Sequence, residues 1–195
     1  MKILIASDIH GSAFYCRKLM EAVNKETPEK LLLLGDVLYH GPRNALPEEY
    51  NPQAVSAMLN ELNKTIKILC VRGNCDSEVD QMMLEFPIMA EYCLLFVRGR
   101  TIFATHGHIY NGKNMPPISS GDILLHGHTH VAAWENLIND CLYLNPGSVS
   151  IPKNDSKRGY MTLDNNGFVW KDLDGNIFHN LKFNKRETRE IKECH

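Results

Sequence analysis

The sequence lacks the features that mark membrane, secreted and nucleic-acid-binding proteins. No apolar run in its 195 residues approaches the roughly 18 residues that a membrane span needs. Met1 and Lys2 lead into an apolar segment without a signal-peptide pattern. The net charge of −2 offers no basic surface to a nucleic-acid backbone, so duplex binding is not expected. We therefore expect a cytoplasmic protein that binds no membrane and whose partner is small or is another protein.

The six cysteines form no Cys-x-x-Cys pair and follow no regular spacing. This usage is typical of free thiols in a reducing compartment. The hydrophobic content of 44% is that of one ordinary soluble domain, and a chain of this length buries about 70% of the surface that it exposes when unfolded. We predict a single domain over residues 1–184. A charged tail without an apolar period follows over 185–195, where we expect a frayed helix or disorder.

What the sequence does contain is a set of short apolar runs that end in potential ligands. The run 31–34 is bounded by Pro28 and Gly35, which favours a buried parallel strand over a helix. Asp36 then stands at the carboxyl end of that strand, where α/β sheets bind their ligands. Four other runs end in the same way, at Asp8-x-His10, Gly73-Asn74-x-Asp76, His106-x-His108 and Gly127-His128-x-His130. We expect five strands to bring oxygen and imidazole groups to one edge.

The two halves of the chain differ in their expected elements. In the first half, helices are predicted over 12–24, 53–63 and 77–85, with Ser12 as a cap and a capping box from Ser77 to Asp80. The segment 39–52 contains three prolines and a glycine, which predicts a long loop over the ligand edge. From residue 92 onward a hairpin and several short strands follow. The pattern predicts two facing sheets with helices outside.

The chemistry of the strand ends favours a metal site. Hard divalent cations that activate water prefer carboxylate and imidazole ligands, and a second cation needs a ligand that can bridge. Side chains two residues apart on a strand point to the same side, so two of the motifs can each hold a metal with a pair of side chains. The alternative, solvated polar residues at loop starts, requires chance to order all seven on strand ends. The candidate ligands are Asp8, His10, Asp36, Asn74, His106, His128 and His130.

In this order the motifs resemble those of the calcineurin-like metallophosphoesterases. The ordered blocks lie between residues 8 and 130, about the first two thirds of the chain. The segments 35–47, 72–81 and 145–153 are similar to the small bacterial phosphodiesterases of the YfcE type. The resemblance implies an α/β fold, namely a four-layer α/β/β/α sandwich of two mixed sheets flanked by helices. It also implies phosphodiester hydrolysis at a dinuclear metal site.

The resemblance further implies a role for each candidate ligand. One metal ion would be held by Asp8, His10 and His130, and the other by Asn74, His106 and His128, with Asp36 bridging the two. The site is usually filled with Mn²⁺, and Fe, Zn, Ni and Co are alternatives. A hydroxide shared by the two ions would attack phosphorus in line, while both ions neutralise the phosphate oxygens.

One position departs from the wider family, which has histidine where this chain has Cys75. A thiol is a poorer hydrogen-bond donor than an imidazolium, so we expect poor alkoxide leaving groups to react least well. The hypothesis is that Cys75 lies in the site as a weak polar group, and that His108 or a metal-bound water supplies any proton. His108 is equally well explained as a loop residue. Asp76 either orients an imidazole of the site or caps the helix that begins near residue 77.

Other polar residues each have two possible roles. Arg43, Asn44 and Arg72 are candidate contacts for substrate phosphate, although Arg43 is also compatible with a solvated loop cation. The segment 145–148 either holds the ligand loops by hydrogen bonds or is a plain strand-to-turn junction. His126 continues the spacing of the ligand histidines, but we expect it to be a packed or hydrogen-bonded residue instead.

We predict a metal-dependent phosphodiesterase that acts on a small phosphodiester substrate. Two alternatives stay open. One is a protein-binding scaffold of the same architecture, as in a retromer subunit whose metal site is degraded. The other is a phosphomonoesterase that uses the same metals. The intact ligand blocks favour an enzyme. A homo-oligomer is compatible with the family, whose small members commonly self-associate.

Overall fold

The apolar runs of the first half form the parallel centre of a six-stranded sheet. A computed structural model describes residues 1–183, in which β1 (Ile3–Ala6), β2 (Lys30–Leu33) and β3 (Lys67–Cys70) pair in parallel. Three later antiparallel strands extend the sheet on the side of β1. These are β9 (Gly159–Asp164), β10 (Gly167–Asp172) and β11 (Ile177–Lys182), giving the order β11-β10-β9-β1-β2-β3. The tail predicted over 185–195 lies outside the described residues.

A second, five-stranded sheet is built from the other half of the chain. Its hairpin, β4 (Tyr92–Val97) and β5 (Arg100–Thr105), turns at Arg98 and Gly99, both with positive φ, as a tight two-residue turn requires. The remaining strands are β6 (Ile123–His126), β7 (Ala132–Asn136) and β8 (Leu142–Pro146), and the order is β4-β5-β6-β8-β7. A short 3₁₀ turn, η1 (Ile138–Asp140), connects β7 to β8.

The three predicted helices form, and the two predicted caps are present. In α1 (Ala13–Glu26) the Ser12 side chain accepts the N–H of Tyr15 at 3.2 Å. The helix α2 (Pro52–Asn63) follows the predicted loop. The predicted capping box starts α3 (Glu78–Met83), which ends two residues earlier than expected because Leu84 is extended. The Gln81 side chain holds that extended chain through the carbonyls of Leu84 and Phe86.

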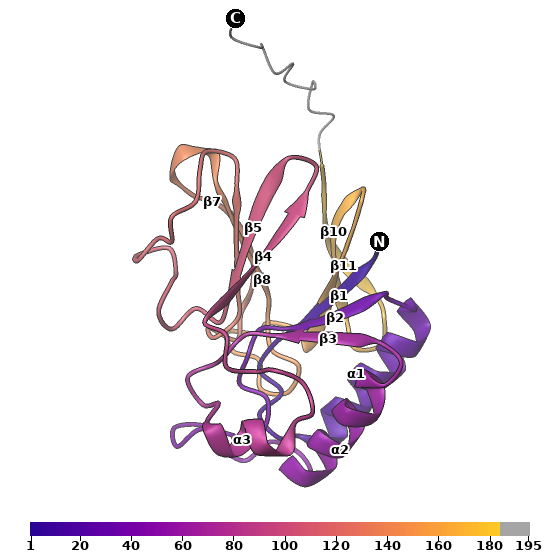
Figure 1. The fold of residues 1–195 in the computed structure, drawn as a ribbon. Helices are drawn as coiled ribbons and strands as arrows, with labels where there is room; N and C mark the ends of the chain where they lie inside the picture. The colour runs from indigo at the N-terminus through magenta and orange to yellow at the C-terminus, as the bar shows by residue number, and fades with distance from the viewer. Residues whose placement is uncertain (184–195) are drawn as a thin grey trace, which may run out of the picture.

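Alternation along the central strands builds two hydrophobic cores. On β1, Ile3 and Ile5 face the core between the two sheets, whereas Leu4 and Ala6 face the core beneath α1 and α2. Figure 1 shows the two sheets facing each other, with α1 and α2 on the outer side of β1, β2 and β3. The prediction of two mixed sheets flanked by helices is confirmed.

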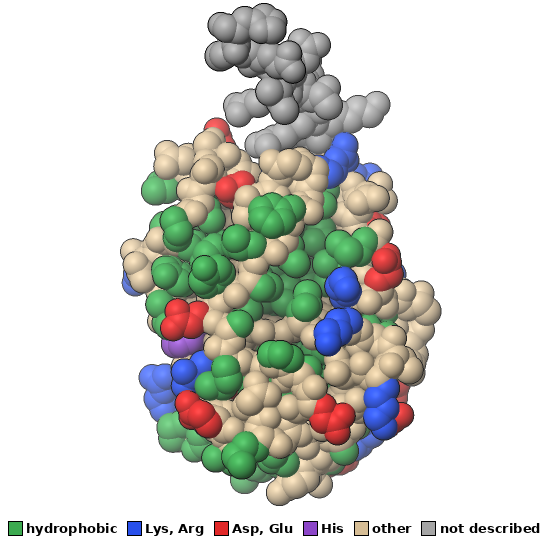
Figure 2. Space-filling model, viewed as in Figure 1, with side chains coloured by type: hydrophobic (Ala, Val, Ile, Leu, Met, Phe, Trp, Pro, Cys, Tyr) green, Lys and Arg blue, Asp and Glu red, His purple; other side chains and the backbone are tan. Residues whose placement is uncertain are grey.

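The helices are distributed unevenly over this sandwich. Within residues 1–183, α1, α2 and α3 all precede β4, and α1 and α2 lie on the side of the six-stranded sheet (Figure 1). Tyr110, between β5 and β6, packs edge-on against Phe103 of β5 at 5.3 Å between ring centroids. Figure 2 shows hydrophobic side chains gathered on the face of the molecule seen in Figure 1, and β4 exposes Tyr92, Leu94 and Phe96.

The topology corrects one expectation about the ligand-bearing strands. Three of them, β1, β2 and β3, belong to the six-stranded sheet, and β5 and β6 belong to the five-stranded sheet. Their carboxyl ends therefore meet across two facing sheets rather than along the edge of one.

No helix in residues 1–183 combines the length and apolar character that a membrane crossing demands. Five cysteines in this part of the chain are free thiols: Cys16, Cys70, Cys75, Cys93 and Cys141.

Candidate active site

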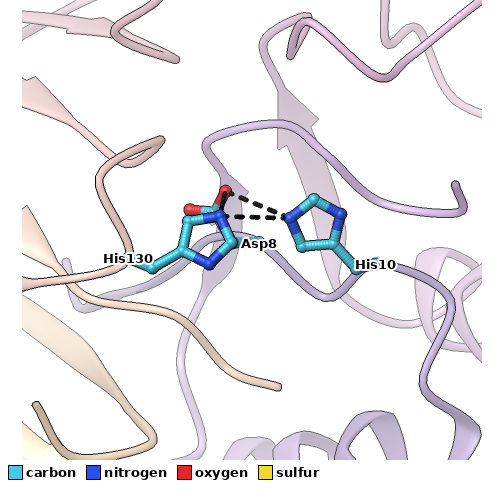
Figure 3. Close-up of side chains that lie close together, drawn as sticks. All are labelled: Asp8, His10 and His130. Carbon is cyan, nitrogen blue, oxygen red and sulfur yellow. Dashed lines mark hydrogen bonds and ion pairs between the residues drawn. The ribbon is translucent and has the colours of Figure 1, made fainter. Parts of the chain in front are cut away.

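The first group of potential metal ligands is formed by three buried side chains (Figure 3). Asp8 and His10 follow β1, and His130 follows β6 from the opposite sheet. Asp8 Oδ1 lies 3.3 Å from Nε2 of His130 and 3.6 Å from Nε2 of His10. The two Nε2 atoms are 3.3 Å apart. One carboxylate and two imidazoles thus converge on a single point.

A second group lies beside the first and is built from different strands. Asp36, after β2, and His106, after β5, approach to 3.4 Å between Oδ2 and Nε2. His128 completes the group with its Nδ1 3.1 Å from Nε2 of His106. The side-chain oxygen of Asn74 is also 3.1 Å from that nitrogen. A carboxylate, two imidazoles and an amide oxygen therefore meet at this second point.

The carboxylate of Asp36 connects the two groups. Its Oδ2 is 3.4 Å from His106 in the second group and 3.7 Å from His10 in the first. A third set of mutually close donors, His10, Asp36 and Cys75, lies between them. All seven ligands predicted from the sequence are thus brought together, with Asp36 in the central position that a bridging ligand requires.

Hydrogen bonds to the protein backbone fix which imidazole nitrogen faces the site. The Nδ1 atoms of His10, His106 and His130 lie 2.8, 2.6 and 2.7 Å from the carbonyl oxygens of Tyr39, Leu34 and Ile151, respectively. A carbonyl oxygen only accepts, so each Nδ1 carries a proton and each Nε2 is the nitrogen left to bind a metal ion. This is the arrangement that metal-bound histidines adopt.

The electrostatics of the site favour positive charge. Burial raises the pKa of Asp8, but His10 and His130 outweigh it and hold the pKa well below its usual range. Burial lowers the pKa of His106, but the carboxylates of Asp36 and Asp8 raise it to about 9. A potential that retains a proton on a buried imidazole equally attracts a cation. Asp8 Oδ1 is buried without a hydrogen-bond donor among residues 1–183, so the donor set fits divalent metal ions.

The backbone is strained where the ligands lie. Asp8, His10, Asp36, His128 and His130 all have φ between 50° and 64°, a left-handed conformation that costs about 1 kcal/mol or more per residue for side chains other than glycine. At these residues the backbone turns sharply away from the direction of the preceding strand. Gly73 lets the chain come close to the central carboxylate, because a Cβ there would lie 2.1 Å from Asp36 Oδ1.

Asp76 has a different role from either one predicted. Its carboxylate accepts the backbone N–H groups of Asp36, Val37 and Gly73 at 2.8, 2.9 and 2.7 Å. Within residues 1–183 it therefore bonds to backbone amides and not to an imidazole, contrary to the prediction that it orients one. It does not cap α3 either, since that role belongs to Ser77 and Asp80. Burial raises the pKa of Asp76, although the three N–H groups oppose the shift. Asp76 instead joins the loop of the central carboxylate to the loop of Asn74.

The segment 145–148, at the end of β8, holds the ligand loops by hydrogen bonds, which was one of its two predicted roles. The Asn145 side chain donates to the carbonyl of Gly127 at 2.9 Å. The hydroxyls of Ser148 and Ser150 both donate to the carbonyl of Asp8, at 2.9 and 3.0 Å. These bonds tie the loop of β1 to the loop of β6 across the two sheets.

A cavity of about 320 Å³ opens onto the ligands. Arg43 and Asn44, two of the candidate phosphate contacts, line it. Arg72 does not line this cavity and instead lies on a neighbouring one, where its Nε donates to the carbonyl of Asp76 at 3.3 Å. Sequence reasoning missed Lys153, which lines the cavity beside His130 and whose N–H donates to the carbonyl of that histidine at 3.1 Å. Its only signal was membership of the segment 145–153.

Cys75 and three histidines complete the surroundings of the two donor groups. The thiol of Cys75 accepts from the Asn74 amide at 3.3 Å, and burial together with the charge of Asp36 raises its pKa to about 12. His108 lies 5.4 Å from His106 between ring centroids, and burial lowers its pKa. Burial also lowers the pKa of His128. His126 stacks on Tyr143 at 4.3 Å and takes part in neither donor group, as expected of a packed residue.

Comparisons with known proteins agree with this arrangement. The model of the calcineurin-like phosphoesterase superfamily domain matches residues 1–167. Phosphodiesterase YfcE of Escherichia coli strain K12 is 46% identical over 165 residues, which cover 85% of this chain and 88% of that protein. Phosphodiesterase MJ0936 of Methanocaldococcus jannaschii is 28% identical over 155 residues, which cover 75% of this chain and 83% of that protein.

A solved structure extends the likeness to the fold. The structure of YfcE, a phosphoesterase from E. coli, aligns with a TM-score of 0.88 at 43% identity and covers 94% of this chain and 100% of that chain. The family resemblance seen in the motifs is therefore confirmed over most of the chain. This chain belongs to the calcineurin-like phosphoesterase superfamily.

Proposed function

We propose that this protein is a metal-dependent phosphodiesterase acting on a small phosphodiester. The observation that carries the proposal is the position of Asp36, whose Oδ2 lies 3.4 Å from an imidazole of one donor group and 3.7 Å from an imidazole of the other. A carboxylate between two sets of buried nitrogen and oxygen donors is the feature that a dinuclear site needs. The curated relatives named above are phosphodiesterases, which supports the same reaction.

The residues divide into two ligand sets around that carboxylate. Asp8, His10 and His130 would hold one ion, and Asn74, His106 and His128 the other. Divalent ions bound there would supply an activated water for attack on phosphorus and would neutralise charge on the phosphate oxygens. Imidazole, carboxylate and amide donors suit Mn²⁺, which we propose as the ion in the cell, although Fe, Zn, Ni and Co accept similar donors.

The other residues of the cavity bind and orient the substrate. Arg43, Asn44 and Lys153 line the cavity, and their N–H groups would hold the phosphate oxygens that do not face the metals. The ring of His108 lies 5.4 Å from that of His106 between centroids and is not itself a proposed ligand, so we assign it proton delivery to the leaving oxygen. Cys75 would remain a neutral polar neighbour of the central carboxylate.

The setting of the site is consistent with this role. A cavity of about 320 Å³ suits a small ester and is too small for a nucleic-acid duplex. The free thiols of residues 1–183 support the cytosol as the compartment. In a protein that serves only as a scaffold, nothing would maintain both donor groups, the hydrogen bonds that orient their imidazoles and the strained backbone of the ligands.

The test is the hydrolysis of bis(4-nitrophenyl) phosphate by protein loaded with Mn²⁺. We expect turnover that a chelator abolishes and that added Mn²⁺ restores, and we expect Asp36→Asn to lose it. A matched assay with 4-nitrophenyl phosphate separates a diesterase from a monoesterase, because the two substrates share one leaving group. Equal activity with and without chelator would contradict the proposal, and faster turnover of the monoester would replace it with a phosphomonoesterase.

A further inference from the structure

A second and larger cavity adjoins the one that opens onto the ligands. Its volume is about 710 Å³, against about 320 Å³ for the first. Pro42, Arg43, Asn74 and Cys75 line both, so the two cavities adjoin each other beside the second donor group. A phosphate bound at the ligands would therefore have one of its substituents directed toward this second space.

The second cavity has an aromatic and aliphatic side as well as charged lining residues, namely Arg43, Arg72, Asp76 and Asp80. Tyr39 and Tyr50 both line it, and both contact the ring of His40 edge-on, at 4.8 and 5.1 Å between ring centroids. Leu38 and Val79 add aliphatic surface. Aromatic rings prefer edge-to-face or offset partners, so two tyrosines fixed around one imidazole present ready surfaces to a further ring.

Hydrogen bonds connect the aromatic lining to the residues around the proposed metal site. The carbonyl of Tyr39 accepts from Nδ1 of His10 at 2.8 Å, so the residue that lines the second cavity also orients a ligand of the first group. The carbonyl of His40 accepts from the Asn44 side chain at 2.8 Å, which holds the turn between the two cavities. The second cavity therefore keeps a fixed position relative to the proposed reaction centre.

We propose that the second cavity binds an aromatic or heteroaromatic ester group, the substituent that remains on phosphorus after hydrolysis. The inference rests on the proposed phosphodiesterase function and deepens it by naming the substrate class. A phosphomonoester has no such substituent and would leave the cavity unused, whereas a diester places one beside its phosphate. The volume of the second cavity lies within the range of about 300–1,000 Å³ that is typical of small-molecule sites. A small alkyl group such as methyl would fill only a small part of it.

The test compares two diesters that release the same leaving group. Bis(4-nitrophenyl) phosphate retains an aryl group on phosphorus, and methyl 4-nitrophenyl phosphate retains a methyl group. We measure the ratio of their kcat/KM values with Mn²⁺-loaded protein, because this ratio is independent of the fraction of the protein that is folded. We expect Tyr39→Ala and Tyr50→Ala each to lower the aryl-to-methyl ratio by about twofold to tenfold, the range that one aromatic contact supplies.

Two sets of variants control the measurement. Tyr39→Phe and Tyr50→Phe keep the rings and should keep the ratio, and Tyr92→Ala removes a ring from β4, outside both cavities, and should leave the ratio unchanged. Turnover of both diesters with an unaltered ratio in the Tyr39→Ala and Tyr50→Ala variants overturns this inference alone. Failure of the wild-type protein to turn over either diester overturns the proposed function and this inference with it.

Discussion

Removing the carboxylate of Asp76 should weaken both the fold and the metal site. This side chain is 2% exposed and accepts three backbone N–H groups, at 2.7, 2.8 and 2.9 Å. Two of the donors, Asp36 and Val37, follow β2, and the third, Gly73, follows β3. The substitution Asp76→Ala leaves all three donors buried without a partner.

The size of the effect follows from these three bonds. A hydrogen bond to a charged group is worth about 1.5–3 kcal/mol, and losses at neighbouring donors are not additive. We therefore expect Asp76→Ala to lower the free energy of unfolding by about 3–5 kcal/mol, a large part of the stability of an ordinary domain. Asp76→Asn keeps one acceptor oxygen and should cost less. Because the same bonds position Asp36, Mn²⁺ affinity should fall by about 10–100-fold in Asp76→Asn.

Urea denaturation of metal-free protein measures the first effect, and calorimetric titration with Mn²⁺ measures the second. Asp174→Ala is the matched control, since Asp174 is exposed, and surface changes of this kind stay within about 0.5 kcal/mol. An unfolding free energy of Asp76→Ala within about 1 kcal/mol of the wild type would refute the reasoning, because buried amide donors would then have found other partners.

Three further predictions concern other parts of the molecule. Despite its burial, Glu26 has a pKa lowered from 4.5 to about 2 by two lysines and Tyr160. Above the pKa that Glu26 has in the unfolded chain, these contacts should therefore contribute about 2 kcal/mol to the free energy of unfolding. This contribution should be lost as the pH falls toward 2, so the melting temperature of Glu26→Gln should depend less on pH than that of the wild type. Cys75→His should speed alkyl diesters more than aryl diesters, and an unchanged leaving-group dependence would make Cys75 a bystander. Lys153→Gln should raise KM by about threefold to tenfold with a smaller change in kcat, and an unchanged KM would remove Lys153 from the substrate site.

Much of the fold was predictable because its signals are local. The cap of α1 at Ser12 and the capping box of α3 at Ser77 depend on residues within one turn of the helix start. The hairpin at Arg98 and Gly99 depends on a two-residue turn. The candidate ligands were also recognisable, because each follows an apolar strand and only their order along the chain was needed.

What could not be predicted depends on contacts between distant segments. The division of the ligand strands between two sheets is set by pairings such as β1 with β9, which no local period records. Asp76 illustrates the same limit, since two of its three amide partners are 39 and 40 residues earlier in the chain. Spacing alone suggested an imidazole or a helix end as its partner.

The substrate side of the site was also hidden from the sequence. Lys153 is one exposed lysine among many until its backbone N–H meets the carbonyl of His130. The loop 39–52 carries no periodic signal, so the meeting of Tyr39 and Tyr50 around His40 appears only in three dimensions. Loops of this kind decide which ester fits, whereas the strands decide what chemistry is available.

The central claim is that Asp36 serves two metal ions at once. The most direct test is anomalous diffraction at the manganese edge from crystals grown with Mn²⁺. We expect two anomalous peaks per chain, each with an Asp36 carboxylate oxygen in its coordination, and at most one peak in Asp36→Asn crystals. A single peak in the wild type, or two peaks that Asp36 does not contact, would contradict the account.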